Sequence, residues 1–196
     1  MKTLHKNQYR KNSKEEQSDP GDDVKKYCIE NYGIIGNMHS AALISIEGSI
    51  DWFCFPDLDS PSVFGAILDP QKGGFFKLSP LGKFNKKQLY RPDTNVLVTR
   101  FLHTDGVGEV TDFMPMGFRR EDATGYGYTS QIIRMVRVVR GKLKFRLECF
   151  PAFDYGRENH KVEIKDNGAV FEAGDLALTL HSDMSLITSG TGVVSE

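Results

Sequence analysis

The sequence of 196 residues has no apolar run that approaches the roughly 18 residues of a membrane-spanning helix. It also has no excess charge of either sign, because 25 Lys and Arg stand against 26 Asp and Glu. Balanced charge argues against a general nucleic-acid binder, which carries a basic surface. Neither a membrane nor a nucleic acid is therefore expected as a partner.

Cysteine is scarce and scattered. Cys28, Cys54 and Cys149 form no CxxC pair, which argues against a disulfide framework and against a zinc site. The simplest interpretation is that the three cysteines are small apolar core residues of a protein in a reducing cytoplasm. The five histidines have no partner at i+2 or i+4, so no metal is expected. Phosphate-binding glycine loops and the G-x-S-x-G elbow are missing, and no cofactor is expected.

The first 26 residues differ from the rest. They alternate charges and amides, lack an apolar h-region for secretion, and contain the turn-rich joint 18–21. Such a composition cannot offset the entropy of ordering. We predict a disordered tail over residues 1–26 and one β-sandwich domain over 27–196.

From Tyr27 onward the dominant period is two. Short turns rich in Gly, Asp and Asn separate runs of alternating apolar residues about ten residues apart, which indicates an antiparallel sandwich or barrel. The runs with strand character are Ala41–Ile46, Ser49–Phe55, Asn95–His103, Val107–Pro115, Ser130–Val139, Leu143–Phe150, Val162–Lys165, Ala169–Ala173 and Leu176–His181. The clearest hairpin pairs Ser130–Val139 with Leu143–Phe150. The fold class is all-β.

Two further features refine this fold. One short helix is expected from Ser60, as N-cap, through Pro61 at N1 to Leu68, before Asp69-Pro70 stops it. At the other end, Leu186–Ser189 begins a strand and only Val193-Val194 follows the Gly190–Gly192 turn. This predicts an unpaired edge strand, and hence either a truncated chain or a fragment of a longer gene product. The alternative is that the last residues pair within the domain.

Carboxylates are plentiful, and paired carboxylates are the catalytic groups of glycosidases. Asp51, Asp57 and Asp59 cluster in one segment, and Glu109 with Asp112 lies on another strand. Turn and cap chemistry is the simpler role for the loop aspartates. Arg91 and Arg157 are candidates to tie a carboxylate such as Asp112 or Asp154 by paired hydrogen bonds.

Ten segments, taken in order, resemble one known family: the N-terminal domain of glycoside hydrolase family 15 proteins, the glucoamylase- and trehalase-like group. They are Tyr32–Asn37, Ala41–Ser45, Gly48–Pro56, Asp59–Phe64, Tyr90–Pro92, Thr94–Leu97, Val110–Pro115, Arg134–Val136, Gly141 and Phe153–Arg157. Their order, their spacing and the single Trp in a Gly-Ser-Ile-Asp-Trp context make the resemblance specific. It covers about residues 32–157.

The resemblance implies a β-supersandwich followed by a linker and an (α/α)6 barrel that holds two catalytic glutamates. Such proteins hydrolyse α-glucosidic bonds with inversion of configuration at the anomeric carbon. This reaction needs a carboxylic acid and a carboxylate base roughly 6.5–9.5 Å apart. A chain that ends at Glu196 includes no such barrel, so we predict that it is inactive by itself. Its partners would be that barrel and α-glucosides, with a homo-oligomer through the C-terminal edge as a further possibility.

We expect the Asp51–Phe64 segment to form the interface with the barrel and to border the sugar pocket. Trp52 or Phe55 would stack on a glucosyl face, Asp51 would accept a hydroxyl hydrogen bond, and Asp59 belongs to the same loop. The competing interpretation makes Trp52 a core residue and Asp51 a turn cap. A stand-alone carbohydrate-binding module and a dimerisation module remain the alternatives to a glycosidase domain.

Overall fold

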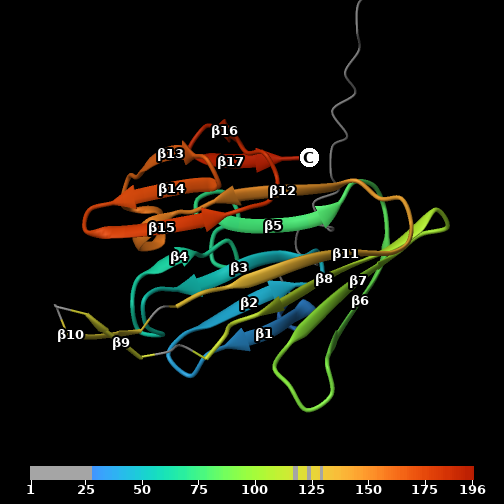
Figure 1. Ribbon diagram of the computed structural model, residues 1–196, viewed down its shortest axis with the longest axis horizontal. Coiled ribbons are helices and arrows are strands. Elements are labelled where there is room, and N and C mark those ends of the chain that lie inside the picture. The colour runs from blue at the N-terminus through green and yellow to red at the C-terminus, as the bar shows by residue number, and fades with distance from the viewer. Residues whose placement is uncertain (1–27, 117–118, 123–124, 129) are drawn as a thin grey trace, which may run out of the picture.

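The computed structural model describes residues 28–116, 119–122, 125–128 and 130–196. In these residues the fold is mostly β, with an eight-stranded, a four-stranded and a three-stranded sheet and one two-stranded hairpin (Figure 1). Every paired neighbour is antiparallel, which confirms the all-β antiparallel prediction. The predicted tail 1–26 lies outside the described residues.

The eight-stranded sheet combines both ends of the described chain. Its order is β1-β2-β3-β5-β12-β17-β16, with β4 paired to β3. The bounds are β1 Tyr32–Gly36, β2 Ala41–Ser45, β3 Ser49–Cys54, β4 Ser62–Phe64, β5 Phe75–Pro80, β12 Phe145–Phe150, β16 Ile187–Ser189 and β17 Gly192–Ser195. The runs Ala41–Ile46 and Ser49–Phe55, predicted as strands, are β2 and β3, and they pair as a hairpin.

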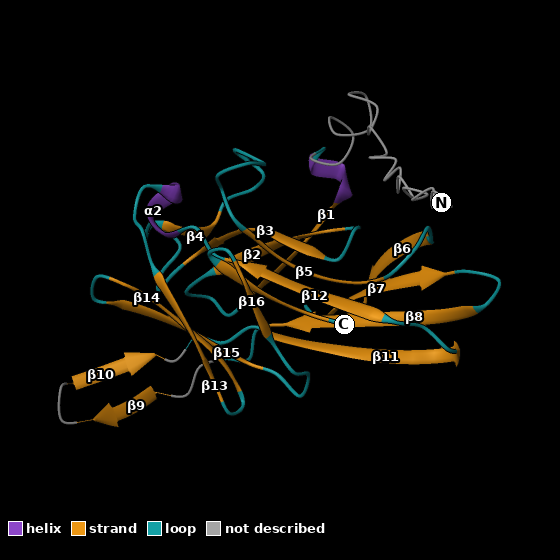
Figure 2. Ribbon diagram, turned by 90° about the horizontal axis from the view of Figure 1, so that it is seen from above, coloured by secondary structure: helices purple, strands orange, loops and turns teal. Residues whose placement is uncertain are grey.

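The four-stranded sheet lies against it in the order β11-β8-β7-β6, with β6 Asn85–Tyr90, β7 Leu97–Leu102, β8 Gly106–Phe113 and β11 Ile133–Gly141. The runs Asn95–His103 and Val107–Pro115, predicted as strands, are β7 and β8, and they pair as a hairpin. Seen from above, β11 is the outer strand of this layer (Figure 2). The three-stranded sheet is β13 Lys161–Lys165, β14 Gly168–Ala173 and β15 Leu176–His181, and the separate hairpin is β9 Arg119–Asp122 with β10 Gly125–Tyr128.

The core fills the space between the two larger sheets and extends under β14. Fully buried side chains of β2, β3 and β12 face those of β7 and β8; they include Ile44, Ile50, Leu97, Phe101, Val110 and Cys149. Phe101 and Phe145 meet edge to face across this space, with centroids 6.4 Å apart. Phe171 of β14 joins the same cluster. The sequence period of two therefore has its physical cause in one inward face per strand.

The predicted helix from Ser60 to Leu68 is wrong. Ser62–Phe64 is strand β4, which pairs with β3 and is wholly buried, and Gly65–Asp69 then forms a turn. Strand pairing and burial override the helical spacing here, because Val63 also accepts a backbone hydrogen bond from Ala152. Within the described residues the helical elements are the 3₁₀-helix η1 (Ile29–Asn31) and the one-turn α2 (Phe153–Gly156).

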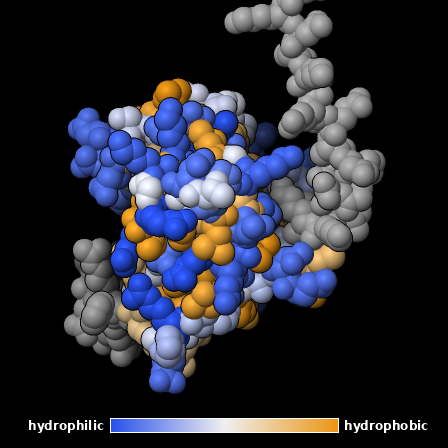
Figure 3. Space-filling model, turned by 90° about the vertical axis from the view of Figure 1, so that its right-hand side faces the viewer, coloured by the Kyte–Doolittle hydropathy of each residue, from blue (hydrophilic) through white to orange (hydrophobic). Residues whose placement is uncertain are grey.

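The predicted hairpin between Ser130–Val139 and Leu143–Phe150 is also wrong. Both strands exist, but β11 pairs with β8, whereas β12 pairs with β5 and β17 in the other sheet. The link after Gly141 therefore carries the chain from one layer to the next. Figure 3 shows this end of the molecule, where hydrophobic patches lie between charged side chains.

The unpaired C-terminal edge is not found. β17 lies between β12 and β16, so the alternative, pairing within the domain, is correct. The edge strand on this side of the sheet is the short β16, on which Ile187 is exposed.

Candidate functional site

A β-bulge in β3 places Asp51 and Trp52. Leu43 of β2 is opposite Trp52 and Ile44 is opposite Ile50, so Asp51 is the extra residue of the bulge. The Asp51 carboxylate is 1% exposed; Oδ2 accepts from the Tyr32 hydroxyl at 2.8 Å and Oδ1 accepts from Ser49 Oγ at 2.5 Å. Asp51 therefore joins β1 to β3 through hydroxyl donors of the protein itself.

Trp52 lies half-buried in an apolar row that crosses three strands on the outside of the sheet. The register brings Ile34, Leu43 and Trp52 side by side, and the Trp52 ring lies 6.3 Å from that of Tyr155. Ile34 is 54% exposed and Tyr155 is 43% exposed. We call Ile34, Leu43, Trp52 and Tyr155 the outer apolar row. It offers an aromatic pair to solvent at one end of the sheet.

A left-handed turn presents Tyr155. Asp154, Tyr155 and Gly156 have φ values of 49°, 57° and 75°, a conformation that costs non-glycine residues free energy and gathers at functional sites. Arg157 fastens this turn: its Nη2 donates to Asp154 Oδ1 at 2.6 Å, and its guanidinium lies over the Tyr155 ring at 5.5 Å. The predicted contact between Arg157 and Asp154 is present, but only one hydrogen bond reaches the carboxylate, because Nε donates to the Asp154 backbone carbonyl at 3.1 Å.

The other two candidate residues lie apart from this pair. The Phe55 ring packs beside Phe53 at 6.2 Å and is half-buried, and Asp59 is exposed in the following loop. That loop is held by Leu58, whose N–H donates to the His39 carbonyl at 3.0 Å. The structure thus brings Trp52 together with Tyr155, which the sequence interpretation did not single out, and not with Phe55 or Asp59. Tyr155 appeared only inside the family motif Phe153–Arg157.

Four segments collect at this end of the molecule, on the left in Figure 1. Backbone hydrogen bonds join 37–40 to 56–61 and join Ile67 to Asp51, while Gly156 lies against Lys72. We call residues 37–40, 56–61, 66–72 and 153–157 the loop end. Large apolar side chains are exposed on it, among them Met38 at 87%, Leu58 at 60% and Leu68 at 67%. Three of the four segments therefore each contribute a large exposed apolar side chain.

Three carboxylates that the sequence singles out are engaged by other groups of the chain. Glu109 binds Arg100, Asp112 binds Arg134, and Asp51 is held by hydroxyl donors. No group of three or more His, Cys, Asp or Glu in the described ranges has the geometry of a metal site. In the same part of the chain, no helix has the length and apolarity to cross a membrane.

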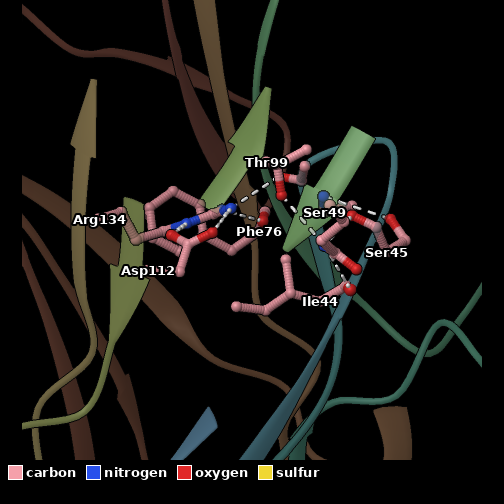
Figure 4. Close-up of polar contacts among 9 residues, drawn as sticks. Ile44, Ser45, Ser49, Phe76, Thr99, Asp112 and Arg134 are labelled. Atoms are coloured by element: carbon pink, nitrogen blue, oxygen red, sulfur yellow. Dashed lines mark hydrogen bonds and ion pairs between the residues drawn. The ribbon is translucent and has the colours of Figure 1, made fainter. Parts of the chain in front are cut away.

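Arg134 is the buried charge that the sequence interpretation missed. Its Nε donates to Asp112 Oδ1 at 2.8 Å, and its Nη groups donate to the Phe76 and Gly48 carbonyls of the facing sheet (Figure 4). The guanidinium lies 4.7 Å from the Phe76 ring centroid. Asp112 is therefore held by Arg134, not by Arg91 or Arg157. The available signal was an Arg at position 134 of an alternation that otherwise holds Ile132, Val136 and Val138.

The family follows from comparison with known proteins. A family model described as "Trehalase-like, N-terminal" matches residues 21–186. The chain belongs to this family. The resemblance stated from the sequence is thereby confirmed, and the matched range includes the outer apolar row, the loop end and the Arg134–Asp112 pair.

Three relatives illustrate the match. A trehalase of Thermoplasma volcanium is 32% identical over 163 residues, which is 81% of this chain and 25% of the relative. Trehalase 2 of Sulfolobus acidocaldarius is 34% identical over the same shares. A trehalase of Mycolicibacterium smegmatis is 36% identical over 66% of this chain and 21% of its own length. The chain spans about a quarter of the length of the curated relatives it matches. No solved structure matches significantly.

Proposed function

We propose that this chain is the non-catalytic N-terminal domain of a cytoplasmic glycosidase that hydrolyses an α-glucosidic bond, with trehalose as the first substrate to test. Hydrolysis itself would be carried out by an (α/α)6 barrel elsewhere in the polypeptide. The observation that carries the proposal is the family match together with relatives named trehalases. The arginine-bound and buried carboxylates of this chain agree with a division of labour between two domains.

In this proposal the loop end docks on the barrel and forms part of the rim of its sugar pocket. Met38, Leu58 and Leu68 supply exposed apolar contacts, which gain free energy when another surface removes them from water. The Trp52–Tyr155 pair supplies an aromatic face at the same end. Asp51, with its two protein hydroxyl donors, would keep β3 in place beneath that face, and Phe55 and Asp59 would belong to the docking loop.

The test uses the full-length polypeptide and the 196-residue chain, each assayed for glucose release from trehalose and maltose. The full-length protein should be active and the chain alone inactive. In the full-length protein, Trp52→Ala should lower kcat/KM at least about tenfold, or ~1.4 kcal/mol, with little change in melting temperature. Leu81→Ala, at the opposite end of the domain and 42% exposed, is the matched control and should leave kcat/KM unchanged.

Two outcomes contradict the proposal. Glucose release by the purified 196-residue chain would place catalysis in the β-domain. A Trp52→Ala variant that loses melting temperature but keeps its kcat/KM when folded would make Trp52 a packing residue and remove the loop end from the pocket.

A stand-alone carbohydrate-binding module is the second candidate, favoured by one observation: Tyr155 is 43% exposed beside Trp52. Titration calorimetry of the 196-residue chain with trehalose and with maltoheptaose separates the two. A binding heat that disappears in Tyr155→Ala would support the module, and its absence would leave the glycosidase domain.

A further inference from the structure

The inner face of the four-stranded sheet is buried along β7 and β8 but partly exposed along β11. Cross-strand neighbours on that face are Thr99 of β7, Val110 of β8 and Val136 of β11. Thr99 and Val110 are fully buried, yet Val136 is 41% exposed, and so is Val138 two residues along the same face. Side chains that point between two sheets are normally covered by both. Among the described residues, the sandwich is therefore incomplete along β11.

A groove of about 1030 Å³ occupies this open side. Its floor is formed by side chains of the facing sheet, Phe76, Leu78 and Leu147, and its walls are β11 and the segment from Leu180 to Ser185. The floor is apolar, and polar groups such as Asp166 and Ser182 lie on the wall opposite β11. An apolar floor beside a free strand edge matches the requirements of strand addition, in which backbone hydrogen bonds and alternate side chains both contribute.

The two edges of this sheet are built differently. β6 carries Lys86 and Lys87, charges of the kind that protect an edge from pairing. β11 is nine residues long and exposes Met135, Val136, Val138 and Val139. β11 also carries the exposed charges Arg137 and Arg140, so the difference between the two edges is the set of exposed apolar side chains on β11.

The charges across this sheet indicate which kind of strand could pair with β11. Arg100, Glu109 and Arg137 form a row across β7, β8 and β11, in which Glu109 is bonded to Arg100. In the described ranges Arg137 has no ion-pair partner of its own, so a carboxylate on an added strand would continue the alternation. A second copy of β11 does not satisfy this, because β11 contains three arginines and no carboxylate.

We propose that the groove beside β11 receives one extended β-strand, apolar at alternate positions and carrying a carboxylate opposite Arg137. The strand comes from the part of the full-length glycosidase that lies outside these 196 residues. This inference rests on the proposed function, since it takes the chain as one domain of a longer polypeptide. The added strand would pair with β11 and place its apolar side chains on Phe76, Leu78 and Leu147.

Thiol labelling tests the proposal. Val136→Cys is introduced into the 196-residue chain and into the full-length polypeptide, both carrying Cys28→Ser, because Cys54 and Cys149 are buried. Reaction with a maleimide should be at least tenfold slower in the full-length polypeptide. Lys87→Cys, on the exposed edge strand β6 of the same sheet, is the matched control and should react at equal rates in both.

A second variant tests the charge. Arg137→Glu should lower the melting temperature of the full-length polypeptide by about 2–4 °C more than that of the 196-residue chain, the shift that corresponds to roughly 1 kcal/mol. An equal effect in both would contradict the carboxylate opposite Arg137.

Equal labelling rates of Val136→Cys in the two proteins would overturn the added strand. Protection in the 196-residue chain itself, together with a dimer by light scattering, would assign the groove to a second copy and overturn the proposal equally. The glucose assay is a separate readout: an active protein with an unprotected Val136→Cys rejects this inference alone, and a protected but inactive protein rejects only the proposed activity.

Discussion

At the scale of single residues, the Arg134–Asp112 pair dominates the interior. Its side chains are 3% and 0% exposed, and the guanidinium also binds two carbonyls of the facing sheet. A buried pair of this kind contributes little over a well-packed apolar pair, but each charge depends on the other because neither reaches water. The pair therefore fixes how the two sheets face each other.

Arg134→Ala should lower the free energy of unfolding by about 3–5 kcal/mol, because Asp112 is left as an uncompensated buried charge. Urea denaturation measures the change. The control is Arg157→Ala, which breaks an exposed pair with Asp154 and should cost about 0.2–1 kcal/mol. Similar losses in the two variants would show that water reaches Asp112 in the folded protein.

At the scale of elements, the sequence predicts strands better than it predicts their neighbours. β2, β3, β7, β8, β14 and β15 follow from alternation because each has one inward face. The placement of β11 and β12 in different sheets does not follow from alternation. A turn with Gly has the same sequence signature whether it closes a hairpin or connects two sheets. β6 was missed because its alternation is polar, and β4 because three buried residues carry no period.

For the candidate site, too, the sequence predicts single residues better than it predicts their contacts. Asp51 and Trp52 were located by the family motif, and the bulge explains why adjacent residues act together. Tyr155 lies about a hundred residues after Trp52 in the sequence. The α2 turn brings its ring close to that of Trp52. Contacts made by such turns depend on left-handed backbone at non-glycine residues, for which composition gives no signal.

The Glu47-Gly48 turn between β2 and β3 supplies the prediction at this scale. Gly48 has φ +79°, and a Cβ atom there would lie 2.5 Å from the Leu78 carbonyl oxygen. Gly190 has φ +58° and open space around it within the described residues. Gly190→Ala should cost about 1–2 kcal/mol from the left-handed backbone alone. Gly48→Ala should cost a further ~1–3 kcal/mol from the collision.

Chemical denaturation of both variants measures this difference. Equal losses would mean that the β2–β3 turn moves away from β5 without a cost in free energy. The turn would then not depend on its packing against β5.

At the scale of the whole molecule, stability should depend on alkaline pH through the buried thiols. Burial raises the pKa of Cys149 to about 12 from its ordinary value of 9.0, against a smaller opposing effect of Arg134, and burial also raises the pKa of Cys54. The folded state thus keeps a proton that the unfolded state releases. The contribution is complete below pH 9 and is lost as the pH rises toward 12.

Relative to Cys149→Ala, the chain should lose up to about 1.4 kcal/mol of unfolding free energy per pH unit between pH 9 and 11. Urea titrations of both proteins at several pH values measure it. Parallel pH profiles for the two proteins would show that the Cys149 thiol ionises without unfolding.

The sequence contains a single tryptophan, and it lies in the outer apolar row beside Tyr155. Intrinsic fluorescence excited at the indole absorption band therefore reports on one place in this chain, the surface proposed to face the catalytic barrel. Quenching by acrylamide would measure how far solvent reaches that place without any label.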